Sequence, residues 1–331
     1  MLLINWLKLE VRRRIIKSLL TPSHRKKIRG KRERKRKTEN RSHQVFYLHQ
    51  VDDPYSHLCC QILDQLENSY DIEVMPLVVG PPPPSSTPEV EMLQKHNIED
   101  AKMIAPYYGL TFETNEMDIE SKNIKIAQSI LLGTNQESFA KVSLQVGDAL
   151  WRNDSETLQD LQQNSTVLSD EEISARIQIN SQKQKKLGHY YGGVFAYEGE
   201  CYGCIDRVPF LEERLVELGT TKSDQQSIFK RKSLKDERPL KLDGLTLEVL
   251  FSVRSPYSYL ALQQIIEFRK RYPIKVVYRP ILPMVMRGMV INREKMFYIL
   301  SDCKRIAEKK GIPFGNLSLI HILTLPTILL V

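Results

Sequence analysis

The feature that most constrains this chain is an internal repeat with a constant spacing of 202 residues. One group of recurring residues follows an apolar segment: Pro54, Tyr55, Ser56 and Leu58 return as Pro256, Tyr257, Ser258 and Leu260. A second group lies in a later helical pattern: Asp100, Lys102, Ile104, Ala105, Gly109 and Phe112 return as Asp302, Lys304, Ile306, Ala307, Gly311 and Phe314. A constant offset over so long a stretch is hard to obtain by chance. The sequence therefore predicts a tandem duplication of one domain.

The first copy is predicted over residues 43–219 as an α/β domain. Its expected elements are, in order, a buried strand at 45–50, a helix from Pro54, a strand at 72–80, a helical block over 89–187, a hairpin at 192–208 and a helix at 210–219. The hairpin is expected to turn near Glu198-Gly199, and Gly219 is expected to end the last helix. This order resembles the thioredoxin-like plan with a helical insertion.

The second copy is predicted at 241–317, after a polar linker at 220–240. Only 17 residues follow Phe314, so we expect this copy to lack most of the helical block, the hairpin and the last helix. The closing run SLIHILTLPTILLV at 318–331 resembles nothing in the first copy. We expect a foreign tail there, and the alternative is a native strand or helix.

The first 42 residues form a basic arm. Residues 1–41 contain 16 Lys and Arg and 3 acidic residues, whereas the other 290 residues contain 32 basic and 37 acidic ones. Residues 2–20 could form an amphipathic helix, and the charge run at 25–37 is expected to be disordered in isolation. The arm predicts contact with an anionic membrane surface rather than nucleic acid. The alternative is a solvated tail without a specific partner.

The location predicted for the chain is the cytoplasm, with the arm bringing it to a membrane periphery. No run approaches the roughly 20 apolar residues of a membrane helix. The apolar stretch at the N-terminus is too short for a secretory signal, and its charges follow it. Five cysteines make an odd, sparse set, so a disulfide framework is not expected.

Three segments carry a family resemblance. FSVRSPYSYL at 251–260 is similar to the start of 2-hydroxychromene-2-carboxylate isomerases and kappa-class glutathione transferases, which belong to the DsbA-like thioredoxin group. Residues 295–314 resemble a helical segment of that group, and residues 192–215 resemble its terminal hairpin and helix. The resemblance implies two tandem DsbA-type thioredoxin domains with helical insertions. It also implies glutathione as cofactor and a small aromatic or conjugated substrate.

Ser255 is the residue to which the resemblance gives a catalytic role. As an N-cap followed by Pro256 at the first helical position, it is explained by helix capping alone. In the family, the position of Ser255 binds the sulfur of glutathione. A helix N-terminus favours an anion, a thiol there ionises more readily, and the Ser255 hydroxyl can donate to the thiolate. The expected glutathione-binding residues are Ser255, Pro256, Tyr257, Ser258, Lys295 and Arg305.

Lys295 and Arg305 share one helical face with Tyr298 and Asp302. This pattern suits a solvated face with internal ion pairs. The resemblance implies instead that the helix lies over the cleft, so that Lys295 or Arg305 could hold a carboxylate of substrate or glutathione. The first copy has Met103 in place of Arg305.

The first copy departs from the family at its corresponding site. Asp53 occupies the place of the serine, where its carboxylate keeps the N-cap but would repel a thiolate. Gly193 stands where relatives carry a cis-proline. We expect a degenerate, structural first domain, and the alternative is that Asp52 or Asp53 acts as a general base.

The sequence predicts a glutathione-dependent isomerase or transferase, and two other functions are alternatives. A DsbA-type thiol oxidoreductase needs a thiolate, but positions 53, 56, 255 and 258 hold no cysteine. The motif Cys201-Tyr202-Gly203-Cys204 lies on the outgoing strand of the hairpin, where core packing explains it better. Without a second C-x-x-C no four-cysteine zinc site is available, and no metal is predicted. The remaining alternative is a non-catalytic scaffold peripheral to the membrane.

Overall fold

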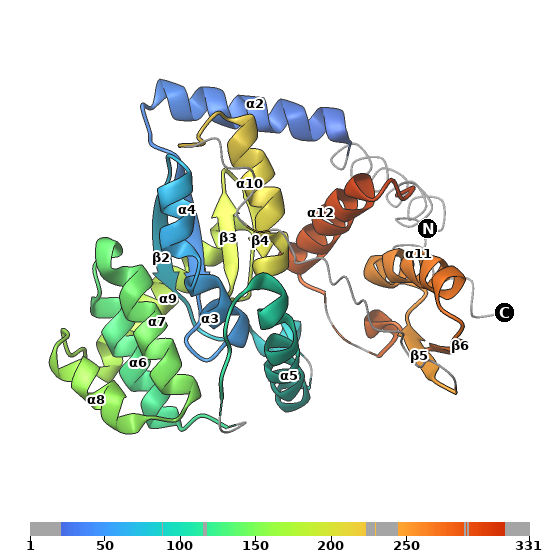
Figure 1. The fold of residues 1–331 in the computed structure, drawn as a ribbon. Coiled ribbons are helices and arrows are strands. Elements are labelled where there is room, and N and C mark those ends of the chain that lie inside the picture. Colours follow the sequence, from blue (N-terminus) through green and yellow to red (C-terminus); the bar gives the residue numbers. More distant parts are fainter. Residues whose placement is uncertain are drawn as a thin grey trace, which may run out of the picture. The chain divides into compact units, whose positions relative to one another are not determined.

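The computed structural model describes residues 21–87, 89–114, 118–222, 229, 244–287, 289 and 291–314. The chain divides into two compact units (Figure 1). The N-terminal unit comprises Lys35–Leu234, and the C-terminal unit comprises Lys235–Val331 together with Met1–Arg34. The segments predicted as an amphipathic helix at 2–20 and as a foreign tail at 318–331 lie outside the described residues, as does most of the predicted linker.

The N-terminal unit contains a four-stranded sheet with the order β2-β1-β3-β4. β1 (Gln44–His49) pairs in parallel with β2 (Glu73–Val78) and antiparallel with β3 (Val194–Tyr197), which pairs with β4 (Glu200–Gly203). The predicted hairpin is confirmed. Its turn lies at Glu198 and Gly199, both with positive φ (41° and 75°), as a two-residue turn with matching twist requires.

Two short helices follow β1, and a helical block separates β2 from β3. In chain order the helices are α3 (Pro54–Cys60), α4 (Leu63–Ser69), α5 (Val90–Tyr108), α6 (Ser121–Gly133), α7 (Gln136–Trp151), α8 (Ser155–Gln163), α9 (Asp170–Leu187) and α10 (Val208–Glu217). The single helix predicted from Pro54 is wrong, because the chain leaves the helix after Cys60 and re-enters it at Leu63. Helix α9 begins with a capping box in which Ser169 and Glu172 satisfy each other's backbone N–H groups.

The core of the N-terminal unit lies between the sheet and its helices. Tyr47 and Phe195 stack on neighbouring strands with ring centroids 5.2 Å apart, and both are fully buried. A second cluster joins α3 to α5 and consists of Leu58, Ile98, Ala101, Ala105, Phe112 and Trp151. This second cluster holds α5 against α3, the helix that Asp53 caps.

The C-terminal unit contains a two-stranded parallel sheet and two long helices. β5 (Thr246–Phe251) leads into α11 (Pro256–Arg271), and β6 (Lys275–Pro280) leads through a short 3₁₀ turn into α12 (Arg293–Lys309). A small cluster joins the two helices and consists of Leu260, Cys303, Ala307 and Phe314. Among the described residues of the chain, no helix is both long and apolar enough to cross a membrane.

The two units share local geometry at the spacing of the sequence repeat. In the first unit Gln44 pairs with Glu73, and in the second Thr246 pairs with Lys275, so the strand register is the same after a shift of 202. The cluster of the C-terminal unit repeats part of the α3–α5 cluster, because Leu260, Cys303, Ala307 and Phe314 lie 202 positions after Leu58, Ala101, Ala105 and Phe112.

Helix α2 (Pro22–Thr38) covers the charge run that was expected to be disordered, so that prediction is wrong. Lysine, arginine and glutamate are good helix formers, and this propensity favours the helix despite repulsion between like charges. Lys35 and Glu39 form an ion pair at 3.6 Å one turn apart. None of the residues of α2 is fully buried, and several are half-buried.

Candidate functional sites at two helix N-termini

Helix α11 begins as the sequence predicts. Ser255 is its N-cap, with φ −91° and ψ 120°, and its Oγ accepts a hydrogen bond from the Ser258 backbone N–H at 3.3 Å. Pro256 follows at the first helical position, where no N–H is needed. The β5–α11 loop is fixed by Ser258, whose Oγ accepts from the Ser252 N–H at 3.1 Å.

The Ser255 hydroxyl remains able to donate. It is only partly buried, and within the described part of the chain its oxygen receives one hydrogen bond while its hydrogen has no acceptor. The first-turn N–H groups of α11 also carry the partial positive charge of a helix start. The arrangement therefore offers a hydroxyl donor beside a weakly positive helix end.

Helix α3 begins with the same backbone geometry and a different charge. Asp53 is its N-cap, with φ −106° and ψ 118°. The backbone N–H and the hydroxyl of Ser56 both donate to Asp53 Oδ2, at 2.8 and 2.7 Å. Ser56 Oγ in turn accepts from the Gln50 N–H at 3.1 Å, which matches the Ser258–Ser252 bond 202 positions later.

The electrostatic environment of Asp53 works against its ionisation. Burial raises the pKa of Asp53 to about 6, although the two hydrogen bonds from Ser56 act in the opposite direction. The neighbouring Asp52 adds to the rise, and its own pKa is raised by burial while a hydrogen bond from Gln50 at 3.0 Å lowers it. Because neutral pH lies above this raised pKa, Asp53 is still ionised there, and a negative charge is already present at this helix start.

Gly193 lies directly against the first turn of α3. It has φ +61°, and a Cβ atom there would come within 3.0 Å of the Tyr55 carbonyl carbon and 3.1 Å of the Ser56 nitrogen. Its carbonyl accepts from the Cys204 N–H at 2.7 Å. Within the described residues no peptide bond is cis, so Gly193 does not reproduce the cis-proline of the resembling family. Glycine is required here by both space and conformation.

A tyrosine–aspartate pair recurs beside each helix start. In the C-terminal unit the Tyr257 hydroxyl donates to Asp302 at 2.8 Å, and Arg305 donates to the same carboxylate at 3.3 Å. Asp302 is fully buried and Arg305 is 7% exposed. The interpretation of this helix face as solvated is therefore wrong for Asp302 and Arg305. Lys295, one of the residues expected to hold a carboxylate, is half-buried, and burial lowers its pKa.

The equivalent pair in the N-terminal unit lacks the arginine. The Tyr55 hydroxyl donates to Asp100 at 2.7 Å. Met103 occupies the position of Arg305 and is 63% exposed. Asp100 therefore keeps its tyrosine partner without the buried guanidinium that Asp302 has.

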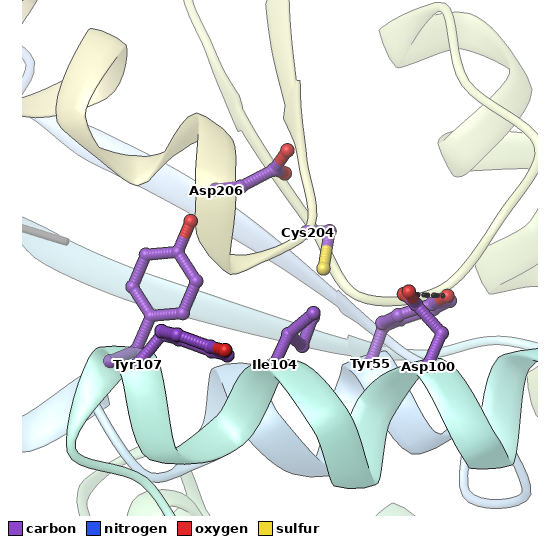
Figure 2. A pocket seen from close by; sticks show the side chains of 7 residues that line it. Tyr55, Asp100, Ile104, Tyr107, Cys204 and Asp206 are labelled. Atoms are coloured by element: carbon purple, nitrogen blue, oxygen red, sulfur yellow. Dashed lines mark hydrogen bonds between the residues drawn. The ribbon is translucent and has the colours of Figure 1, made fainter. Parts of the chain in front are cut away.

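A cavity of about 320 Å³ lies beside this pair (Figure 2). It is lined by Tyr55, Asp100, Ile104, Tyr107, Tyr108, Cys204 and Asp206. Cys204 and Asp206 come from the end of the hairpin and lie across from the side chains of α5. The sequence analysis missed this cavity. The recurrence of Tyr55 and Asp100 as Tyr257 and Asp302 was the available signal, because it marks residues held together in both units.

The two cysteines of the hairpin are free thiols. Burial, followed by the charge of Asp206, raises the pKa of Cys204, so its thiol stays protonated at neutral pH. Cys201 is buried and donates to the Leu187 carbonyl at 3.4 Å. A protonated thiol is a poor nucleophile, so this geometry favours packing over thiol exchange.

Comparisons with known proteins identify the C-terminal stretch. Residues 246–318 match the family described as the DSBA-like thioredoxin domain, and this part of the chain therefore carries a DsbA-like thioredoxin domain. Among solved structures, a 2-hydroxychromene-2-carboxylate isomerase aligns over 53% of this chain and 96% of its own, with 13% sequence identity and a TM-score of 0.38. A search of curated proteins found no match.

Proposed function

We propose that the C-terminal unit is a glutathione-dependent isomerase or transferase of the 2-hydroxychromene-2-carboxylate isomerase type. The observation that carries this proposal is the Ser255 hydroxyl, which caps α11 while keeping its hydrogen available. Positions 255 and 258 hold serine rather than cysteine, so the helix start suits binding of an external thiolate better than disulfide exchange.

The chemistry follows from charge at the helix start. The partial positive charge and the Ser255 hydroxyl stabilise the glutathione thiolate relative to the thiol. Bound glutathione would supply a thiolate nucleophile able to add reversibly to a conjugated carbon. Ser255 and the first-turn N–H groups of α11 would hold that sulfur in its ionised form.

Lys295 is the better candidate for a carboxylate of glutathione. Arg305 is already bonded to the buried Asp302. Lys295 is half-buried near the start of α12, and a partly desolvated ammonium attracts a carboxylate more strongly than an exposed one. In this proposal Arg305 acts through Asp302 and Tyr257, which hold α12 against α11.

We further propose that the N-terminal unit is a duplicate whose helix start no longer takes a thiolate. The shared strand register and the matched serine contacts support the duplication. Asp53 supports the loss of thiolate binding, because its carboxylate already accepts the Ser56 hydrogen bonds at the helix start. The tandem arrangement would then combine one thiolate site with one altered site.

Calorimetric titration of glutathione into the full chain tests the proposal. Ser255→Ala should weaken glutathione binding about tenfold, because one hydrogen bond to a charged group is lost. S-methylglutathione, which cannot form a thiolate, should bind equally to both proteins. Ser301→Ala, an exposed serine on α12, is the matched control and should bind as the unmodified chain does. Absence of glutathione binding, or equal binding by the Ser255→Ala variant, would refute the proposal.

A further inference from the structure

The cavity of the N-terminal unit carries chemistry that the proposed glutathione site does not use. Its lining combines two carboxylates, three tyrosine rings, one thiol and one isoleucine, and none of these lining side chains is cationic. Figure 2 shows the carboxylates of Asp100 and Asp206 on opposite sides of the space, with Cys204 between them. At about 320 Å³, the cavity is at the lower end of the range that takes a small molecule.

Asp100 gives the cavity an uncompensated negative charge. The Tyr55 hydroxyl is its hydrogen-bond partner, and no ion pair involves it within the described residues. The same residue in the other unit, Asp302, is bonded to Arg305. Because Met103 replaces that arginine, the charge of Asp100 is available to a ligand.

One further carboxylate, that of Asp53, adds to the negative potential, because the charge of Asp206 across the cavity is offset by its ion pair with the adjacent Arg207. Asp53 lies two residues before Tyr55 in the chain. Its charge contributes to the raised pKa of the Cys204 thiol, so the electrostatic field of Asp53 reaches the lining of the cavity. Carboxylates around a partly enclosed space exclude anions and attract cations.

The aromatic rings specify what kind of cation fits. Tyr107 and Tyr108 line the cavity, whereas the corresponding residues of the other unit are Lys309 and Lys310. The faces of tyrosine rings attract ammonium groups by about 0.5–2 kcal/mol each, most strongly where water is excluded. Carboxylate and rings together suit an organic ammonium better than Ca²⁺ or Mg²⁺, which are held by a shell of oxygen ligands.

We propose that this cavity binds a small organic cation carrying an ammonium group, with Asp100 as its counter-ion and the rings of Tyr107 and Tyr108 beside it. Glutathione also carries an ammonium group, but its net charge is negative, so the same carboxylates disfavour it. The two units thus take ligands of opposite charge. This site is independent of the glutathione proposal, because no residue is shared between them.

The test is calorimetric titration of the full chain with choline and n-butylamine, each compared with a neutral isostere, 3,3-dimethylbutanol and n-butanol. At least one cation should bind at least tenfold more tightly than its isostere. Asp100→Asn should remove that preference. Glu99→Gln, an adjacent residue outside the cavity, is the matched control and should leave it unchanged.

A second variant keeps the proposal testable if Asp100→Asn affects folding. Met103→Arg places a guanidinium where Arg305 lies in the other unit and should abolish cation binding with an unchanged circular dichroism spectrum. If neither cation binds better than its isostere, the proposal is wrong. It is also wrong if Asp100→Asn and Met103→Arg both leave the preference intact, or if Glu99→Gln weakens binding as much as Asp100→Asn.

Discussion

Asp53 and Ser255 occupy the same place in the two units. Each ends the loop after a parallel strand, each caps a helix whose first residue is proline, and each has a serine three positions on that fixes the loop. Asp53 accepts two hydrogen bonds through its carboxylate, and burial raises its pKa to about 6. Ser255 accepts one and keeps a hydrogen to donate.

The difference shows that capping and ligand preference are separable properties of a helix start. Any short polar side chain that accepts from the third residue stabilises the backbone, so the fold tolerates either residue. The charge of that side chain decides which ligand the helix dipole can attract. A change from serine to aspartate can therefore remove an anion site without disturbing the structure around it.

The two units also differ at Asp302, which is bonded to Arg305, and Asp100, which has Met103 in the place of that arginine. A substitution at this position should have the largest effect on stability. Arg305→Met makes the C-terminal pair like the N-terminal one and removes the guanidinium that is bonded to the buried Asp302. We expect a loss of up to about 3–5 kcal/mol in the stability of this unit, because the guanidinium partner of a buried carboxylate is removed. Hydrogen exchange of α11 and α12 in the full chain measures it. Arg279→Met, which breaks the exposed pair with Glu248, should cost less than about 1 kcal/mol. Equal effects would contradict the buried-pair interpretation.

The next largest effect concerns the pH dependence of stability and comes from His49. The equivalent residue in the C-terminal unit is Phe251, which does not titrate. Burial, followed by the charge of His57, lowers the pKa of His49 to about 3. The native state therefore binds a proton less readily than the unfolded chain, and stability falls as the pH drops below the unfolded pKa of about 6.5. Between pH 7 and 4.5 this loss amounts to about 2–3 kcal/mol.

His49→Phe should remove that part of the acid sensitivity. Urea denaturation followed by the fluorescence of the buried Trp151, in a Trp6→Phe background, measures the N-terminal unit at both pH values. The variant also loses a 2.9 Å bond to the Tyr47 hydroxyl, so its stability at pH 7 should be lower by about 1 kcal/mol. An unchanged difference between pH 7 and 4.5 would show that His49 titrates normally in the native state.

Asp53→Ser is expected to have the smallest effect and the opposite pH dependence. Because the pKa of Asp53 is raised in the folded state, its contribution to stability is present at low pH and is lost as the pH rises through about 6. Serine keeps the N-cap without titrating. Between pH 5 and 8 the unmodified unit should lose on the order of 1 kcal/mol relative to the variant. A parallel pH profile for both proteins would refute the burial of this charge.

Local rules were sufficient to predict much of the fold. The Ser255-Pro256 helix start follows from capping, and the hairpin follows from Glu198-Gly199 between apolar runs. The break between α3 and α4 has no comparable signal, since Gln61 and Ile62 are acceptable helix residues. Helix α2 was missed because repulsion among its charges was weighted above the helix propensity of lysine and arginine.

The candidate sites were predictable only in part. The sequence marks Ser255 and Asp53 as helix starts, but the functional interpretation of Ser255 came from the family resemblance, and that of Asp53 from the internal repeat. The burial of Arg305 was not predictable, because a helical row of charged residues has the same spacing whether it faces water or a packed helix. The cavity brings Asp100 on α5 against Cys204 and Asp206 after the hairpin, and no local pattern encodes contact across so long a separation.

The shared strand register also bears on how the chain folds. β1 and β5 present the same alignment to a parallel partner, so during folding β1 could pair with β6, and β5 with β2, without any shift. Side chains discriminate between these pairings. Glu248 on β5 forms an ion pair with Arg279 on β6 at 2.7 Å, whereas β2 offers Leu77 at the position of Arg279. Strand exchange between the units would leave both charges without a partner, which disfavours the swapped form.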